Sequence, residues 1–177
     1  MISYEGSIII DGVDITEVPY QQLRQSLIVI TQEALHLPGT VRENLLPLTL
    51  GQAIQTEHDA IKATLEKVKL WSHINAHGGL DVAFDDMEFS QGQRQLFSLA
   101  RALLQKSLLG SKILLVDEAT SSIDYESDTR IQKVLKEAFE DCTRLVIAHR
   151  VQTIADSDIL IEFSNGQLVS FTERIGE

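Results

Sequence analysis

Cysteine is almost missing from this sequence, which has Cys142 alone among its 177 residues. A disulfide within the chain is therefore excluded, and the composition fits a reducing compartment. Basic residues are also scarce, because 15 Lys and Arg stand against 26 Asp and Glu, a formal net charge of −11. Surfaces that bind nucleic acid are usually basic, so we expect no nucleic-acid partner.

Long apolar runs are missing as well. No run approaches the roughly 20 residues that a membrane-spanning helix needs, so we expect no membrane span here and any membrane role to come through a partner. The opening MISYEGSIIIDG lacks the basic start and apolar core of a secretory signal peptide. There is no internal repeat and no low-complexity linker, and the length favours one domain on a prior of roughly 150 residues.

Short apolar runs alternate with amphipathic helical patterns. Apolar strands are expected at residues 7–10, 26–31, 113–117 and 144–149. Two further strands flank Asn165-Gly166, a hairpin signal. Because each of the ranges 26–31, 113–117 and 144–149 contains a continuous apolar run, we predict an α/β fold with a parallel sheet covered by helices on both faces.

Two capping boxes mark helix starts: Thr40 with Glu43, and Ser90 with Gln93. Further helical patterns lie at about 57–70, which HGGLD should end, and near 127–140. The buried stripe of the helix after Ser90 is expected to consist of Leu96, Leu99, Ala100, Leu103 and Leu104. The stretch from about 40 to 105 holds no strand. We expect it to form a helical subdomain inserted between core segments 6–39 and 106–172.

ILLVDEATSSID, residues 113–124, leads a buried strand directly into two adjacent carboxylates, Asp117 and Glu118. Neighbouring negative charges repel, so a cation is expected close by. Asp117 fits a Walker B aspartate that holds Mg²⁺, which bridges nucleotide phosphates, and Glu118 fits a group that orients and polarises water. The alternative is an acidic strand end that only caps the next turn.

A phosphate cradle is the motif that such a site still needs. The P-loop, G-x-x-x-x-G-K-[ST], supplies backbone N–H groups, a lysine and a hydroxyl. None of the ten glycines is followed by lysine, so these residues contain no P-loop. His73 and His77 have the spacing of a metal pair but no obvious third ligand, so we interpret them as solvated.

Four ordered motifs carry a family resemblance. FSQGQRQLFSLARALL, ILLVDEATSSID and LVIAHRVQTI resemble the signature motif, the Walker B and D-loop, and the switch histidine of an ATP-binding cassette (ABC) ATPase. VITQEALHLPGTVRENL resembles the Q-loop region of ABC exporters. The set is most similar to the second nucleotide-binding domain of multidrug-resistance-associated-type exporters, over about residues 6–172.

The resemblance implies an incomplete P-loop NTPase (RecA-like) core with a parallel sheet, a helical signature subdomain and a C-terminal β-hairpin. EGSIIIDGVDI resembles the segment after the P-loop, so the chain is expected to begin just past the phosphate-holding part. Implied cofactors are ATP and Mg²⁺. Implied partners are transmembrane domains and a second nucleotide-binding domain, at the cytoplasmic face of a membrane.

The resemblance also assigns roles to residues near the nucleotide. Gln32 would contact Mg²⁺ or the attacking water, and His149 the γ-phosphate, beside Asp117 and Glu118. Considered alone, Gln32 is better interpreted as a solvated loop amide and His149 as a structural residue. Thr31 stands where the family commonly has proline.

A second group would act across a head-to-tail dimer. Ser90, Gly92 and Gln93 open a helix whose N-terminus can bind an anion, and Asp124 matches the D-loop aspartate. The alternatives are an ordinary capping box and a cap for the helix near 127–140. Gln91 stands where the family usually has a small residue, and its side chain either crowds the phosphate or points outward.

Three functions remain open from the sequence. The first is the ATP-binding cassette domain of an exporter, which couples ATP binding and hydrolysis to transmembrane transport. The second is a non-catalytic fragment or pseudo-cassette that acts only as an interaction module, which the absence of a P-loop favours for the chain alone. The third, a soluble ABC ATPase acting on DNA or ribosomes, is disfavoured by GTVRENL, by the acidic charge and by the lack of a coiled-coil insertion.

Overall fold

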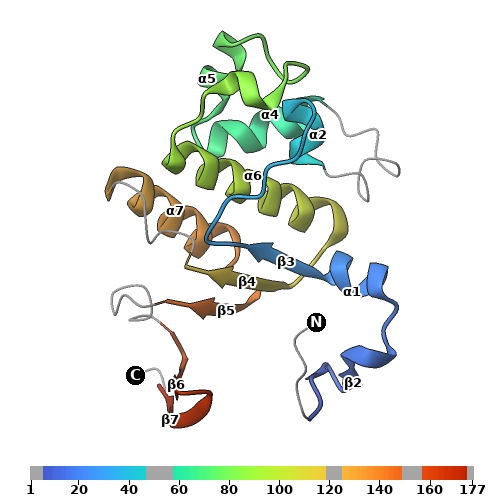
Figure 1. Cartoon of the computed structure of the whole chain (residues 1–177), viewed down its shortest axis with the longest axis vertical. Coiled ribbons are helices and arrows are strands. Elements are labelled where there is room, and N and C mark those ends of the chain that lie inside the picture. Colours follow the sequence, from blue (N-terminus) through green and yellow to red (C-terminus); the bar gives the residue numbers. More distant parts are fainter. Residues whose placement is uncertain (1–5, 47–57, 119–124, 149–156, 175–177) are drawn as a thin grey trace.

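The structure is a computed structural model that describes residues 6–46, 58–118, 125–148 and 157–174 (Figure 1). In chain order its elements are β1 (Ile9–Ile10), β2 (Val13–Asp14), η1 (Ile15–Glu17), α1 (Tyr20–Ser26), β3 (Leu27–Ile30), α2 (Val41–Leu45), α4 (His58–Lys67), α5 (Trp71–Ala76), η2 (Phe84–Met87), α6 (Gln91–Leu109), β4 (Ile113–Asp117), α7 (Tyr125–Ala138), β5 (Thr143–Ile147), β6 (Ile159–Ser164) and β7 (Gln167–Glu173). Figure 1 shows α6 as the middle layer, with α2, α4 and α5 on one side and the sheet on the other.

Strands β3, β4 and β5 form a parallel sheet in that order, which confirms the predicted fold class. The register places Ile30 beside Val116, and Val116 beside Val146. The strand expected at 7–10 does not join this sheet. Its last two residues form β1, which pairs antiparallel with β2 through a turn at Asp11 and Gly12, both with positive φ.

Only one face of the parallel sheet is covered within the described residues. Figure 1 shows α6 and α7 on one side of this sheet. Four strand residues are buried: Ile28, Ile30, Leu114 and Val116. On the other face Val29, Leu145 and Ile147 remain 53%, 57% and 55% exposed. The prediction of helices on both faces is therefore wrong for this part of the chain. The strands are apolar on both sides, but the described helices pack against one side only.

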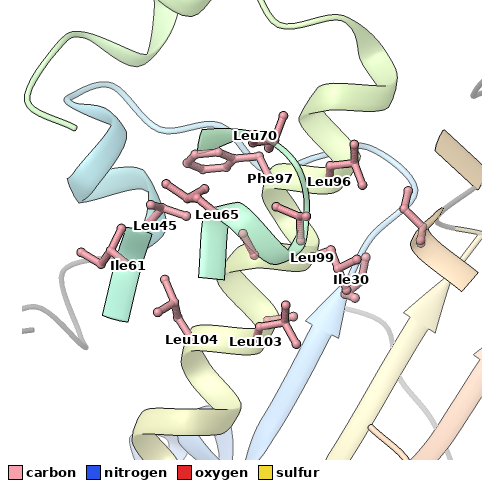
Figure 2. Close-up of a cluster of buried hydrophobic side chains, with 14 of the residues drawn as sticks. Ile30, Leu45, Ile61, Leu65, Leu70, Leu96, Phe97, Leu99, Leu103 and Leu104 are labelled. Atoms are coloured by element: carbon pink, nitrogen blue, oxygen red, sulfur yellow. The ribbon is translucent and has the colours of Figure 1, made fainter. Parts of the chain in front are cut away.

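Helix α6 starts where its sequence predicts. Ser90 Oγ accepts from the Gln93 N–H at 3.2 Å, and Gln93 Oε1 accepts from the Ser90 N–H at 2.8 Å, so the capping box is formed. Gly110 ends the helix with φ 66°, a conformation that favours glycine. The predicted stripe is confirmed as buried: Leu96, Leu99, Ala100, Leu103 and Leu104. Figure 2 shows Leu99 and Leu103 on the side of Ile30 from β3, and Leu104 on the side of Leu45 and Ile61 from α2 and α4.

The helical layer differs from the prediction at one point. HGGLD was expected to end the helix begun near 57, but α4 ends at Lys67 and α5 intervenes. Lys69, between the two helices, adopts φ 62°, and Ile74 of α5 is fully buried. A left-handed lysine gives no sequence signal, so one helix was predicted where two short ones form. The subdomain boundaries at about 40 and 105 stay predictions.

The C-terminal hairpin is confirmed. Strands β6 and β7 pair antiparallel around Asn165 and Gly166, with φ 49° and 77° as a tight turn of this kind requires. Among the described helices, none is both long enough and apolar enough to cross a bilayer.

Candidate functional site

The carboxyl edge of the parallel sheet gathers three of the predicted site residues. Gln32 lies two residues past the end of β3, Asp117 is the last residue of β4, and Glu118 follows it. Because Ile30 pairs with Val116, these residues emerge at the same edge. Asp117 and Gln32 are exposed, whereas Glu118 is half-buried. His149 lies outside the described residues, two positions beyond the last residue of β5.

The backbone at Glu118 has a strained conformation. Its φ is 43°, in the left-handed region, which costs a non-glycine residue about 1–2 kcal/mol. Its N–H donates to the Ile147 carbonyl at 3.0 Å, which fixes the turn against the end of β5. Outliers of this kind cluster at functional sites, where the surrounding structure holds them in place. The strain motivates a functional role for Glu118.

The loop that carries Gln32 is fastened to α6 by side chains that the sequence did not single out. Gln95 Nε2 donates to the Thr31 carbonyl at 3.2 Å and also to the Gln32 carbonyl. Arg101 Nη2 donates to the Leu35 carbonyl at 3.1 Å, and its Nε to the Asn44 carbonyl at 2.7 Å. Burial lowers the pKa of Arg101 to about 10, which leaves the guanidinium charged at neutral pH.

Asn44 fastens the far end of the same loop. Its Oδ1 accepts from the Leu37 N–H at 2.9 Å, and its Nδ2 donates to the carbonyls of Leu37 and Thr40 at 2.8 and 3.1 Å. Asn44 is fully buried, so its amide is satisfied by the loop backbone. Nothing in the sequence near Gln95 or Arg101 indicates the distant partners of these two side chains in the loop.

The N-terminus of α6 holds three predicted residues. Ser90 is exposed, Gly92 is buried, and Gln93 is half-buried with its amide oxygen engaged in the capping box. The Gln91 side chain is exposed. A helix start with backbone N–H groups and a positive dipole end suits an anionic group. Asp124, the remaining predicted member, lies outside the described residues.

Oxygen ligands at the sheet edge suit Mg²⁺. The ion prefers oxygens and is usually held by one or two carboxylates together with substrate phosphates and water. Asp117 offers a carboxylate and Gln32 an amide oxygen on neighbouring strand ends, so the donor set fits. No cluster of three or more His, Cys, Asp or Glu side chains suited to a metal occurs in the described ranges.

His73 and His77 do not form a metal pair. Their rings stack at 4.3 Å, His73 Nε2 lies 2.9 Å from the Met87 carbonyl, and His77 Nδ1 lies 2.8 Å from the His73 carbonyl. The interpretation of both as solvated holds for exposed His77 but is wrong for His73, which is half-buried against Phe89. Both residues support the packing around α5.

Comparisons with known proteins identify the family. Residues 1–121 match the sequence model of the family described as ABC transporter. The chain is 46% identical over 164 residues to an "ABC-type transporter" of Gibberella zeae, covering 93% of this chain and 11% of that protein. It is 41% identical over 171 residues to "Metal resistance protein YCF1" of Saccharomyces cerevisiae, covering 94% and 11%.

A third similar protein is named as an ABC transporter of the C family. "ABC transporter C family member 5" of Dictyostelium discoideum is 40% identical over 174 residues, covering 95% of this chain and 11% of that protein. The chain thus spans about a tenth of the length of the curated relatives it matches.

Proposed function

This chain belongs to the ABC transporter family, and from that premise we propose that it acts in the ATP-binding domain of a multidrug-resistance-associated-type exporter. There it would couple ATP binding and hydrolysis to transport across a membrane. The observation that carries the proposal is the shared sheet edge at which Asp117, Glu118 and Gln32 emerge from neighbouring parallel strands. Ligands of open α/β sheets bind beyond this edge.

Each residue at the edge receives a role suited to its chemistry. Asp117 and Gln32 would present oxygen ligands to Mg²⁺, which when bound neutralises charge on the phosphate oxygens. Glu118 would orient the attacking water and accept its proton. His149, carried on the segment after β5, would donate a hydrogen bond to the γ-phosphate. The phosphates themselves need a P-loop, which these 177 residues do not contain.

The start of α6 would act on a second nucleotide. Ser90, Gly92 and Gln93 would reach across a head-to-tail dimer to the γ-phosphate on another cassette, with Asp124 at the same interface. The exposure of Ser90 at an anion-binding helix end supports this proposal. The proposed partners are therefore a second nucleotide-binding domain and the transmembrane domains, and the proposed location is the cytoplasmic face of a membrane.

The dimer proposal is tested by capture of the chain on a hydrolysis-deficient partner cassette, with and without ATP. ATP should promote capture, because the γ-phosphate is the shared ligand. Ser90→Arg should weaken the ATP-dependent capture by about tenfold or more, because a bulky cation opposes the dipole and blocks the phosphate. Ser72→Arg adds the same charge at another exposed serine of the helical layer and should leave capture unchanged.

Equal capture with and without ATP, or equal effects of the two arginine variants, would remove the support for action in trans. A non-catalytic interaction module would then be the better account. Two observations already favour that second function for the chain alone: the absence of a P-loop sequence and the bare apolar face of the sheet. Such a module would bind its partner irrespective of ATP.

A further inference from the structure

One buried glutamine joins the loop that carries Gln32 to helix α6. The Gln95 side chain is 3% exposed, and its Nε2 donates to the carbonyl oxygens of Thr31 and Gln32. Both acceptors are backbone atoms at the point where the chain leaves β3. The contact therefore fixes the path of the backbone at Thr31 and Gln32.

The orientation of the Gln95 amide follows from its partners. Carbonyl oxygens only accept hydrogen bonds, so the amide nitrogen must face them. Gln95 Oε1 is then buried without a hydrogen-bond partner among the described residues. An unsatisfied buried acceptor is destabilising, and methionine would fill the same volume without it. Compared with methionine, Gln95 contributes the two hydrogen bonds that its Nε2 donates to the carbonyls of Thr31 and Gln32.

The same residue lies near the start of α6. Ser90, the N-cap, precedes Gln95 by five residues, about 7.5 Å along a helix axis. Arg101 and Asn44 fasten the loop farther on, at Leu35 and Leu37. Gln95 makes its contact at Gln32 itself and thus links that residue to the helix that Ser90 begins.

We propose that Gln95 is a positioning residue that locks the Gln32 backbone to α6, so that Gln32 and the helix start at Ser90 move as one unit. The inference rests on the proposed function for what Gln32 and Ser90 do with nucleotide. The lock itself consists of the hydrogen bonds from Gln95 to the backbone of Thr31 and Gln32. A displacement of the loop is thereby transmitted to the helix N-terminus.

Hydrogen exchange of the 177-residue chain, followed by mass spectrometry and corrected for intrinsic rates, tests the lock. The reporters are two amides: Leu37 N–H in the loop, bonded to Asn44 Oδ1, and Arg94 N–H at the helix start, bonded to the Ser90 carbonyl. Gln95→Glu replaces the donor by a carboxylate that repels both carbonyls. At pH 7 it should accelerate exchange at both reporters by about tenfold or more.

Acid should restore the lock in this variant. A buried carboxyl that faces carbonyl oxygens has its pKa raised above the ordinary 4.3, and the protonated group is again a donor. Protection in Gln95→Glu should therefore recover toward the wild-type value at about pH 5. Gln95→Met, which keeps the volume and removes the donor without adding charge, should lose protection at both reporters at either pH.

Gln105→Glu is the matched control. Gln105 is on the same helix and its Nε2 donates to the Leu27 carbonyl at 2.9 Å, so the chemistry is the same at a site away from Gln32. This variant should leave Leu37 and Arg94 protected.

Three results would overturn the lock. The first is unchanged protection of the Leu37 amide in Gln95→Met, and the second is a loss of protection at Leu37 without a loss at Arg94. The third is an equal loss of protection at both amides in the Gln105→Glu control. Absence of acid recovery in a folded Gln95→Glu protein would overturn the role of the donor, and if that variant fails to fold, Gln95→Met decides. No nucleotide is used, so failure here is distinguishable from failure of the ATP proposal.

Discussion

At the scale of single residues, the capping pairs could be predicted but the long-range polar contacts could not. Thr40 with Glu43 and Ser90 with Gln93 were readable because both partners lie within one helical turn. Gln95 and its loop partners are 63 and 64 residues apart, and no local pattern links them. The strand pattern placed Asp117 and Glu118 at the end of a strand, and the family resemblance alone singled out Gln32. The roles of all three residues stay predictions.

Asp141 shows what such a long-range contact does. It accepts from both Lys106, near the end of α6, and Lys112, just before β4. The hydrogen bonds from Lys106 and then Lys112 hold the pKa of the Asp141 carboxyl well below its usual range. Since Lys106 also donates to the Ala138 carbonyl at the end of α7, the cluster joins three elements.

The cluster predicts a pH dependence of stability. Because the folded pKa of Asp141 is depressed, its stabilisation is present above the unfolded value of about 3.8 and is lost as pH falls below that value. Asp141→Asn should lower the urea midpoint at pH 7, and the difference from wild type should narrow below pH 3.8. The effect is modest, since the carboxylate is exposed. Glu140→Gln, at the exposed neighbouring residue, is the control. A difference in urea midpoint between wild type and Asp141→Asn that stays constant with pH would contradict this role of Asp141.

At the scale of elements, the patterns that depend on local sequence were predicted well. Strands β3, β4 and β5 and helix α6 follow from apolar runs and from one capped amphipathic stretch. Helix α5 was missed, because the break between α4 and α5 includes Lys69 with a positive φ, and lysine is not a residue type that signals a break. For the described residues, cover on both faces of the sheet was wrongly predicted, since composition shows that a strand can be buried but not which helices bury it.

The central role of α6 predicts a large cost for truncating its buried stripe. Leu99 is fully buried in the middle layer, so Leu99→Ala should lower the free energy of unfolding by about 2–5 kcal/mol. Ser107→Ala, at an exposed position of the same helix, should change it by less than about 0.5 kcal/mol. Urea denaturation measures both. Similar values for the two variants would mean that α6 does not organise the core.

At the scale of the whole molecule, the described residues leave an apolar sheet face bare. Val29, Leu145 and Ile147 lie together on it, and hydrophobic side chains of β6 and β7 are also exposed. Exposed apolar patches of this kind drive association. The chain spans about a tenth of its relatives, so the function of the whole protein remains a proposal built on this part.

The bare face predicts that the isolated chain associates in solution. Sedimentation velocity at increasing concentration should show species larger than the monomer. Replacing Leu145 and Ile147 together by lysine should shift the distribution toward monomer, because both are more than half exposed and removing them leaves no cavity. Lysine at exposed Ala63 and Ala76 is the control for added charge. A monodisperse wild-type monomer with a sharp thermal transition would contradict this account.

The central claim is that Asp117 and Glu118 belong to an ATP-hydrolysing site whose phosphate cradle is not among these 177 residues. The most direct test compares Mg²⁺-dependent ATP hydrolysis by this chain alone with hydrolysis by the same chain joined to the P-loop-bearing segment of a similar cassette. We predict no hydrolysis by the chain alone, hydrolysis by the joined protein, and a loss of about a hundredfold or more in its Glu118→Gln variant. Hydrolysis by the chain alone that Glu118→Gln abolishes, or a joined protein whose rate Glu118→Gln leaves unchanged, would contradict the claim.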